Sequence, residues 1–249
     1  MSHPPTSAFT AFALEPFPEL RPGDDLAGAV TTFLTRHHIA LEHGDIVVVA
    51  SKVVSIAERR WVDLSTVTPG PEAVELSRRT GKPAPVVQVI LDESTDHYLA
   101  TERGPIIARH KLGLGLTSAG VDRAGPDGVW LLPADPDRSA RGLRDALQAA
   151  TGVRAAVLVV DSDGRPDRRG ATVIAIGAAG IAPLRVTECV QPDGRTKRQE
   201  ETFADLLAGA AGILLGQRGR GAPVAVLRGV AYTDDDAGVA AILHHRRGD

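Results

Sequence analysis

The sequence predicts an α+β protein in which mixed sheets are flanked by helices. Apolar runs of strand length, such as residues 45–50 and 154–161, are interspersed with segments whose apolar residues recur at helical spacing. The two kinds of segment do not alternate regularly, as they would in a doubly wound parallel sheet. No repeat and no linker divides the chain, so we expect residues 1–249 to form one domain, or two lobes that share one core.

Helices are predicted from apolar spacing and from the residues at their ends. The first helix begins after Asp24 and Asp25 and is expected to bury Leu26, Val30, Phe33 and Leu34. A short helix within residues 69–82 begins at a proline and ends at Gly81. The clearest helix spans 135–152, capped by Asp137 and ended by Gly152, with a predicted buried stripe of Ala140, Leu143, Leu147 and Ala150. A last helix at 200–216 is expected to bury Phe203, Leu207, Ala210 and Leu214.

Strands are predicted from continuous apolar runs, which are typical of strands buried on both faces. These runs lie at 45–50, 86–91, 105–110, 129–133, 154–161 and 223–229, with a further apolar segment at 172–181. Residues 51–55 are expected to continue the first strand or to pair beside it. Residues 1–22 are predicted to be extended, and residues 185–199 are polar and are predicted to be irregular.

Composition and missing motifs exclude several classes of function. The net charge is −3 and no long basic block occurs, which argues against nucleic acid as a partner because phosphate neutralisation needs a concentrated basic face. Cys189 is the only cysteine, so no internal disulfide can form. No apolar run approaches the ~18 residues of a membrane span, and no signal-peptide pattern opens the chain, so we expect a cytoplasmic protein without a membrane partner. The P-loop, dinucleotide, HExxH, GxSxG and paired CxxC motifs are absent.

Two aspartates are the candidate site residues. Asp122 follows glycine in S-A-G-V-D, where its carboxylate can coordinate a metal beside a phosphate. Asp161 ends a buried strand, and together with Ser162 it offers hard oxygen ligands suited to Mg²⁺ or Mn²⁺. Each has a structural alternative, since Asp122 also suits a turn and Asp161 a solvated strand end. Gln217, in L-L-G-Q, has an amide oxygen that could join a metal site, although Gly-Gln at a helix end is common.

Seven segments, taken in order, carry a resemblance to a known family. They are GDIVVVASKVVSIAE (44–58), AGVDRA (119–124), LLPADPDRSARGLRDAL (131–147), AAVLVVDSDGRPDRRG (155–170), AIGAAGIAPL (175–184), LLAGAAGILLGQ (206–217) and PVAVLRG (223–229). They resemble the gamma-glutamyl ligase family of deazaflavin coenzyme F-420 biosynthesis. The resemblance implies the α+β fold of that family and a homodimer. It also implies an acid–amino-acid ligase that uses GTP and two Mg²⁺ or Mn²⁺ ions to join glutamate, by way of an acyl phosphate, to a lactyl-phospho-deazaflavin.

The same resemblance implies roles for individual residues. Asp122 and Asp161 match two ligands to one metal and are the expected catalytic pair. Ser162 stands where the family usually has a Thr that binds the other metal, and Gln217 matches a metal-binding Gln found in part of the family, at the cofactor site. Contacts with the nucleotide are implied for Ser51 and, through the backbone, for Pro16, Phe17, Pro18 and Glu19.

The sequence departs from the family on the nucleotide and substrate sides. Ile56 replaces a Lys that contacts the nucleotide, and Gly125 replaces an Asn that does the same. Asp163 and Asp167 replace an apolar residue and a Trp in the relatives' D-T-x-G-R-P-W-R. An Asp in place of the Trp would suit a smaller or more polar substrate.

Three interpretations therefore remain open. The chain is an F-420 gamma-glutamyl ligase, or an amide ligase of the same fold that acts on a different small carboxylate in secondary metabolism, with ATP as the alternative to GTP. The third interpretation is a catalytically silent ligand-binding paralogue. Some relatives carry a C-terminal nitroreductase-like domain, and we expect none in this chain, which ends at Asp249.

Overall fold

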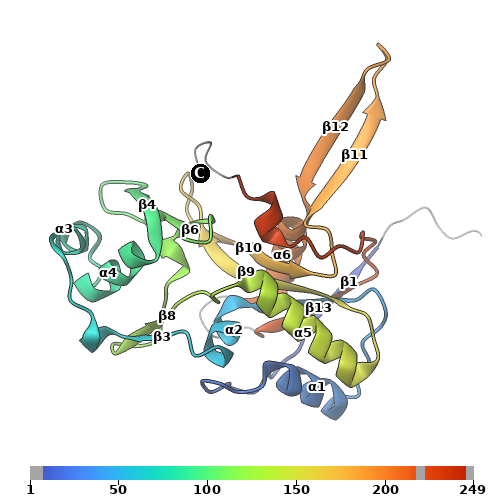
Figure 1. Ribbon diagram of the computed structural model, residues 1–249, viewed down its shortest axis with the longest axis horizontal. Helices are drawn as coiled ribbons and strands as arrows, with labels where there is room; N and C mark the ends of the chain where they lie inside the picture. The colour runs from blue at the N-terminus through green and yellow to red at the C-terminus, as the bar shows by residue number, and fades with distance from the viewer. Residues whose placement is uncertain (1–7, 217–221, 245–249) are drawn as a thin grey trace, which may run out of the picture.

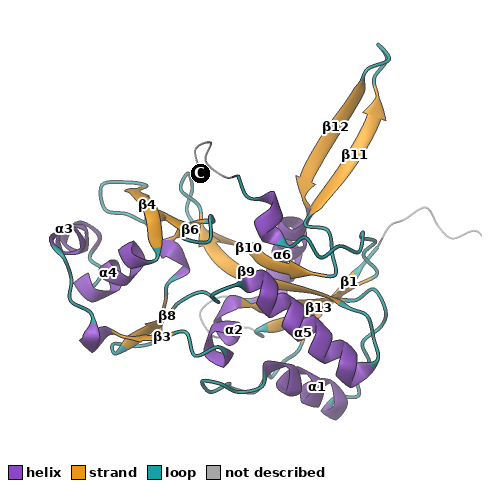
Figure 2. Ribbon diagram, in the orientation of Figure 1, coloured by secondary structure: helices purple, strands orange, loops and turns teal. Residues whose placement is uncertain are grey.

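A five-stranded sheet forms the centre of the computed structural model, which describes residues 8–216 and 222–244 and confirms the predicted α+β class (Figure 1, Figure 2). The strand order is β1-β13-β2-β9-β10. The strands are β1 Thr10–Ala13, β13 Val224–Arg228, β2 Ile46–Ala50, β9 Ala156–Gly164 and β10 Ala171–Ala179. β2 and β9 run parallel, and the other neighbouring pairs are antiparallel.

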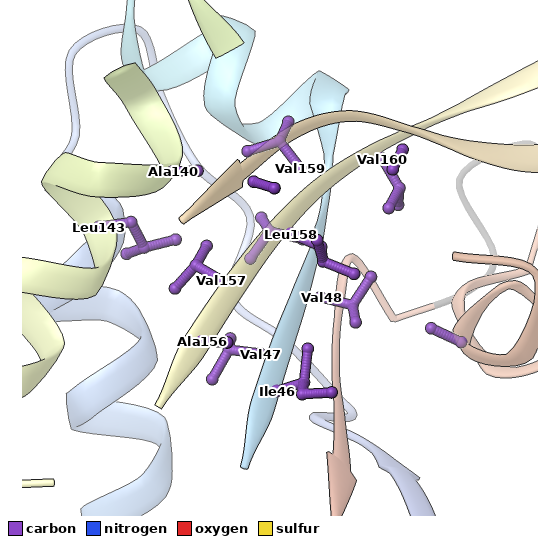
Figure 3. Close-up of a cluster of buried hydrophobic side chains, with 14 of the residues drawn as sticks. Ile46, Val47, Val48, Ala140, Leu143, Ala156, Val157, Leu158, Val159 and Val160 are labelled. Carbon is purple, nitrogen blue, oxygen red and sulfur yellow. The ribbon is translucent and has the colours of Figure 1, made fainter. Parts of the chain in front are cut away.

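Helices cover both faces of this sheet. α1 (Leu26–Arg36) and α5 (Pro136–Thr151) lie on one face, and α6 (Phe203–Leu215) lies on the other (Figure 1). Val157 of β9 lies toward Leu143 of α5, whereas Leu158 and Val160 point to the opposite side, because successive strand residues alternate between faces (Figure 3). The predicted buried face of α1 is confirmed. Because these central strands are buried on both faces, their sequences are continuous apolar runs.

A second group of elements packs beside the sheet. It contains two three-stranded sheets, β3-β8-β7 and β4-β5-β6, together with α3 and α4. The bounds are β3 Trp61–Asp63, α3 Pro71–Thr80, α4 Ala84–Asp92, β4 Ser94–Leu99, β5 Ile106–His110, β6 Gly115–Thr117, β7 Asp122–Arg123 and β8 Gly128–Trp130. Short 3₁₀ turns lie at Leu64–Thr66, Ser118–Gly120 and Val239–Ile242. Most buried residues of this group form a second hydrophobic cluster, whereas Leu116 of β6 belongs to the cluster around the five-stranded sheet.

Two segments predicted as strands are helices. Residues 51–55 belong to α2 (Ser51–Ala57), which begins directly where β2 ends. Residues 86–91 belong to α4, in which Val86, Val87, Val89 and Ile90 are buried. A short run that is apolar on every side cannot be assigned to strand or helix by periodicity, and the prolines at the start of α4 were the better indication of a helix.

The prediction of irregular structure at 185–199 is also wrong. β11 (Leu184–Val190) and β12 (Thr196–Thr202) form a two-stranded hairpin that projects from the body of the molecule (Figure 1). Its side chains are almost all exposed, including those of Val186 and Val190. Because neither strand rests on the core, the hairpin lacks the apolar–polar alternation by which a half-buried strand is recognised.

The N-cap of α5 is Asp135, whose side chain accepts the N–H of Arg138 at 2.9 Å, so the prediction that Asp137 caps the helix is wrong. Asp137 lies inside the first turn and is buried. Its carboxylate accepts the N–H groups of Ala178, Val239 and Ala240 at 2.8, 2.8 and 3.0 Å. The stop at Gly152 is confirmed, whereas Ala150 is exposed rather than buried because it lies on the outer face of the last turn.

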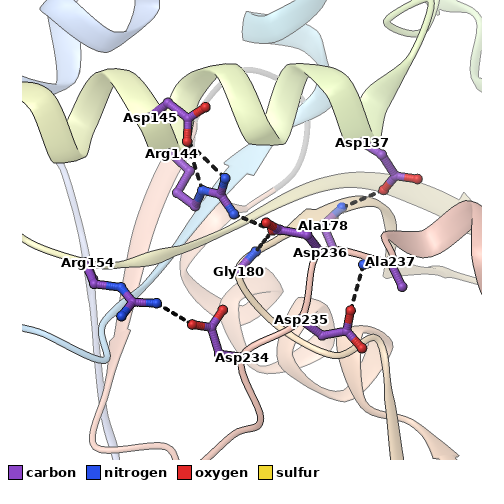
Figure 4. Close-up of polar contacts among 10 residues, drawn as sticks. All are labelled: Asp137, Arg144, Asp145, Arg154, Ala178, Gly180, Asp234, Asp235, Asp236 and Ala237. Atoms are coloured by element: carbon purple, nitrogen blue, oxygen red, sulfur yellow. Dashed lines mark hydrogen bonds and ion pairs between the residues drawn. The ribbon is translucent and has the colours of Figure 1, made fainter.

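The segment after β13 is tied to the sheet by a row of aspartates (Figure 4). Asp236 pairs with Arg144 of α5 and accepts the N–H of Gly180, and Asp234 pairs with Arg154. Together with Asp137, these contacts join α5, β10 and the C-terminal segment. In the described residues, no helix is both long and apolar enough to span a membrane.

Candidate functional site

The candidate site lies at one edge of the five-stranded sheet. β1, β2 and β9 point the same way, since β1 and β2 both run antiparallel to β13, and β2 runs parallel to β9. Their carboxyl ends therefore meet at the same edge. Residues 16–19 follow β1, Ser51 follows β2, and Asp161 lies beyond the paired segment of β9. The carboxyl ends of parallel strands are where ligands bind in open sheets.

Ser51 and Asp161 are brought into contact by the pairing of β2 with β9. The last residues paired are Ala50 and Val160, so the next residue on each strand faces the other. The Ser51 hydroxyl donates a hydrogen bond to Asp161 Oδ1 at 2.6 Å. Ser51 is buried and Asp161 is half-buried, so this contact holds the carboxylate in one orientation at the sheet edge.

Asp122 reaches the same place from the second group of elements. It follows a 3₁₀ turn in which Ser118, Ala119 and Gly120 all have positive φ, at 54°, 51° and 65°. A Cβ on Gly120 would lie 2.7 Å from Leu132, so no larger residue fits there without movement. Asp122 is exposed, and its Oδ2 lies 3.0 Å from Lys52 Nζ. Lys52 is the residue after Ser51, so the two neighbours on α2 contact the two aspartates.

The electrostatics of the pair favour a cation. Burial raises the pKa of Asp161 to about 7, with a smaller contribution from the negative charges of Asp122 and Asp163, and the hydrogen bond from Ser51 acts in the opposite direction. Among the described residues, no Lys or Arg forms an ion pair with Asp161, and a cation within a few ångströms would lower its pKa. Asp122 pairs with the ammonium group of Lys52. Two converging carboxylates that have one ammonium partner between them in the described part of the chain fit a divalent ion.

The protein donors cannot complete the coordination of such an ion alone. Among the described residues, no group of three or more His, Cys, Asp and Glu side chains is arranged to hold a metal. Mg²⁺ typically binds through one or two carboxylates and takes its remaining ligands from water and substrate phosphates. The donor set therefore suits a metal–nucleotide complex better than a metal held only by protein.

The other predicted site residues are placed differently. The exposed side chain of Ser162 lies on the opposite face of β9 from Asp161, since adjacent strand residues alternate. Val173, the residue paired with Ser162, packs close to Gly212 of α6, so Ser162 faces the side of the sheet that carries α6. Residues 16–19 share the sheet edge, with Phe17 packed 6.0 Å from the ring of Phe33. Gln217 lies outside the described residues.

The structure adds two residues that the sequence prediction missed as parts of the site. Lys52 contacts Asp122. It could have been predicted from its position in S-K-V-V, directly after a buried strand. Asp163 lies on the same face of β9 as Asp161, and strand alternation would have shown this. Of the departures, Gly125 has φ 83° in an exposed turn, Ile56 is half-buried, and Asp167 is exposed and paired with Arg168.

Comparison with known proteins agrees with the resemblance. The family model described as F420-0:Gamma-glutamyl ligase matches residues 16–229. A protein of Methanothermobacter thermautotrophicus named Coenzyme F420:L-glutamate ligase is 34% identical over 242 residues, which cover 95% of this chain and 96% of the relative. A protein of the same name from Methanosarcina acetivorans is 36% identical over 228 residues, covering 90% and 87%. Another, from Methanopyrus kandleri, is 39% identical over 227 residues, covering 87% and 86%.

Proposed function

The chain belongs to the F420-0:gamma-glutamyl ligase family, and we propose that it joins L-glutamate to F420-0 through an amide bond, using a nucleoside triphosphate and divalent metal ions. The single observation that carries the proposal is the convergence of Asp122 and Asp161 from separate parts of the fold. At the junction of β2 and α2, the Ser51 hydroxyl contacts Asp161 and the Lys52 ammonium group contacts Asp122. Family membership supports the proposed reaction, and this geometry supports its proposed location.

The chemistry requires activation of a carboxylate, because an unactivated carboxylate does not acylate an amine in water at a useful rate. In the proposed first step, a carboxylate oxygen of the acceptor attacks the γ-phosphorus of the nucleotide. The bond from that phosphorus to the β–γ bridging oxygen breaks, and the nucleoside diphosphate leaves. In the second step, the amino nitrogen of glutamate attacks the acyl carbon. The carbon–oxygen bond to phosphate breaks, inorganic phosphate leaves, and the nitrogen loses its proton.

The residues of the site suit phosphoryl transfer in particular ways. A divalent ion held by Asp122 and Asp161 would supply the positive charge that stabilises the transferring phosphoryl group. Ser51 orients the carboxylate of Asp161. Lys52 pairs with Asp122, and its ammonium group would become free for a phosphate oxygen if Asp122 held a metal. Ser162, Gln217 and a second ion on the α6 side of β9 remain part of the proposal.

GTP is the proposed nucleotide, with ATP as the alternative. Residues 16–19 are proposed to contact the nucleotide through the backbone, and their place at the sheet edge supports this. Ile56 replaces a Lys of the family, so one charge partner for the phosphates is missing. Lys52, one helical turn earlier on α2, is available to provide part of that charge.

A second candidate is an amide ligase of the same fold acting on a smaller carboxylate. The observation that favours it is the position of Asp167, an exposed, ion-paired charge where relatives have a Trp. An aspartate there cannot stack on a flat deazaflavin ring as a Trp can.

A homodimer is also proposed, and the β11–β12 hairpin supports it. An isolated two-stranded hairpin is only marginally stable in water, so an arm of this length gains from a partner surface. Val186 and Val190 lie on one face of the hairpin with exposed fractions of 43% and 73%. A second copy of the chain is the proposed occupant of that face.

Purified protein incubated with F420-0, glutamate, Mn²⁺ and either GTP or ATP tests the reaction. We expect mass spectrometry to show a product heavier by one glutamyl group, together with equimolar nucleoside diphosphate. Reactions lacking glutamate or Mn²⁺ are the controls. Diphosphate release that requires a different carboxylate, with no product from F420-0, would favour the second candidate. No metal-dependent nucleotide binding at all would overturn both.

A further inference from the structure

Asp163 is a buried carboxylate on the strand that also carries Asp161. It is 6% exposed and lies two residues beyond Asp161 on the same face of β9. Its Oδ1 accepts the N–H of Thr117 at 2.8 Å. Its other oxygen lies 3.9 Å from Arg165 Nη1, too far for a hydrogen bond. The main partner of Asp163 is therefore a backbone group on β6.

A second contact strengthens the junction between β9 and β6. The Thr117 hydroxyl donates to the carbonyl oxygen of Gly164 at 2.9 Å. A Cβ at residue 164 would lie 2.7 Å from that hydroxyl oxygen, so β9 and β6 can approach this closely because residue 164 is glycine. Asp163 and Gly164 together hold Thr117 by its N–H and by its side chain.

Thr117 is the last residue before the turn that carries Asp122 into the site. Ser118 and Ala119, both non-glycine, have positive φ, a conformation in which the Cβ of an L-residue crowds the backbone. Such a turn persists only when its surroundings hold it at both ends. The far end is held by pairing of Asp122 with Trp130 and by Leu132 against Gly120. The near end is held by Asp163 and Gly164.

We propose that Asp163 is a positioning residue that sets the place of Asp122 relative to Asp161. One strand, β9, then carries one metal-binding carboxylate directly and locates the other through Thr117. The inference rests on the proposed metal-binding role of Asp122 and Asp161.

Mn²⁺ affinity of the metal-free protein, measured by the loss of the free-ion electron paramagnetic resonance signal, tests the proposal without turnover. Asp163→Ala and Asp163→Asn form a matched pair, because both remove the charge but only Asn keeps an oxygen for the Thr117 N–H. We expect the dissociation constant to rise about 10–100-fold in Asp163→Ala and less than about fivefold in Asp163→Asn. Gly164→Ala keeps the charge and displaces Thr117, so we expect it to weaken binding as well.

Circular dichroism and thermal melting establish that each variant is folded. Equal losses of affinity in the Asn and Ala variants would overturn the proposal, since charge alone would then explain them. Unchanged Mn²⁺ affinity in a folded Asp163→Ala variant, even with a lower melting temperature, would also overturn it. Failure of the wild-type protein to bind Mn²⁺ is a different outcome, which would remove the metal-binding role of Asp122 and Asp161 itself.

Discussion

The hydroxyl of Ser51 donates a 2.6 Å hydrogen bond to Asp161, and this contact joins the carboxyl ends of the two parallel strands of the central sheet. It places a donor on a carboxylate that burial and neighbouring negative charge make hard to ionise. The next residue, Lys52, pairs with Asp122 from the other part of the fold. The start of α2 therefore contacts both carboxylates proposed to bind metal.

The first prediction concerns stability and pH in metal-free buffer. The pKa of Asp161 is about 7 in the folded protein and 3.8 without the fold, so the folded state binds this proton more tightly. The protonated Asp161 therefore stabilises the fold at pH 4, and this stabilisation is lost as pH rises to 7. The loss in the free energy of unfolding is at most about 4 kcal/mol for this half-buried group. We expect urea unfolding to show a larger loss of stability between pH 5 and 8 in wild type than in Asp161→Asn.

The comparison with Asp161→Asn is needed because another group acts in the opposite direction. Burial lowers the pKa of His110, so its contribution is lost as pH falls below about 6.5. His110 is present in both proteins, and its effect cancels in the difference. Equal pH dependence of the two proteins would contradict the prediction. Saturating Mn²⁺ should restore stability at pH 8 in wild type only.

The second prediction concerns Lys52, whose ammonium group must leave Asp122 before a metal binds there. Exposed ion pairs contribute about 0–1 kcal/mol, so Lys52→Met should tighten Mn²⁺ binding in the absence of nucleotide by up to about fivefold. Isothermal titration calorimetry measures this affinity. Lys111→Met is a control, because Lys111 pairs with Glu93 and not with Asp122. Weaker Mn²⁺ binding in Lys52→Met would show that the lysine does not compete with the ion.

The third prediction separates the two aspartates at the start of α5. Asp137→Ala leaves three N–H groups without their acceptor, the buried ones of Ala178 and Val239 and the part-buried one of Ala240, and should lower the free energy of unfolding by about 3–5 kcal/mol. Asp135→Ala removes only the N-cap and should cost about 1 kcal/mol. Urea denaturation measures both. A larger loss in Asp135→Ala would show that the cap, and not the buried carboxylate, carries the stability.

The fourth prediction concerns the hairpin and the proposed homodimer. Val186→Lys with Val190→Lys places charges on one face of the hairpin and should shift the protein from dimer to monomer in analytical ultracentrifugation. Thr187→Lys is the matched control, since Thr187 is exposed on the opposite face. A dimer of unchanged affinity in the double variant would exclude this face as the interface. A monomeric wild-type protein at micromolar concentration would exclude the dimer itself.

Much of the fold could be predicted because its signals are local. The four buried residues of α1 recur at helical spacing, and Gly152 ends α5 with a positive φ, as a glycine at a helix end predicts. The failures have physical causes. α4 is buried around most of its circumference, α2 is only seven residues long, and the hairpin has no core face. None of these three segments carries a periodicity that distinguishes strand from helix or loop.

Some residues of the candidate site could be identified from the sequence, but their contacts could not. Asp122 and Asp161 could be identified from motifs and Ser51 from the family resemblance, yet nothing local indicates that Ser51 donates to Asp161 across 110 positions of sequence. That contact depends on the parallel pairing of β2 with β9. The role of Asp163 depends on a hydrogen bond to a distant backbone group, Thr117, and such bonds leave no pattern in the sequence.

Metal-dependent glutamyl ligation at Asp122 and Asp161 is tested most directly by the rate at which wild type and Asp161→Asn form glutamylated F420-0. The reaction contains GTP, glutamate and saturating Mn²⁺ and is followed by mass spectrometry. The variant keeps the shape of the side chain and an acceptor oxygen for Ser51, so it should remain folded by circular dichroism. We predict that its rate falls more than about 100-fold, beyond the loss typical of a residue that only supports a ligand. A wild-type rate in the folded variant would contradict the assignment of the site.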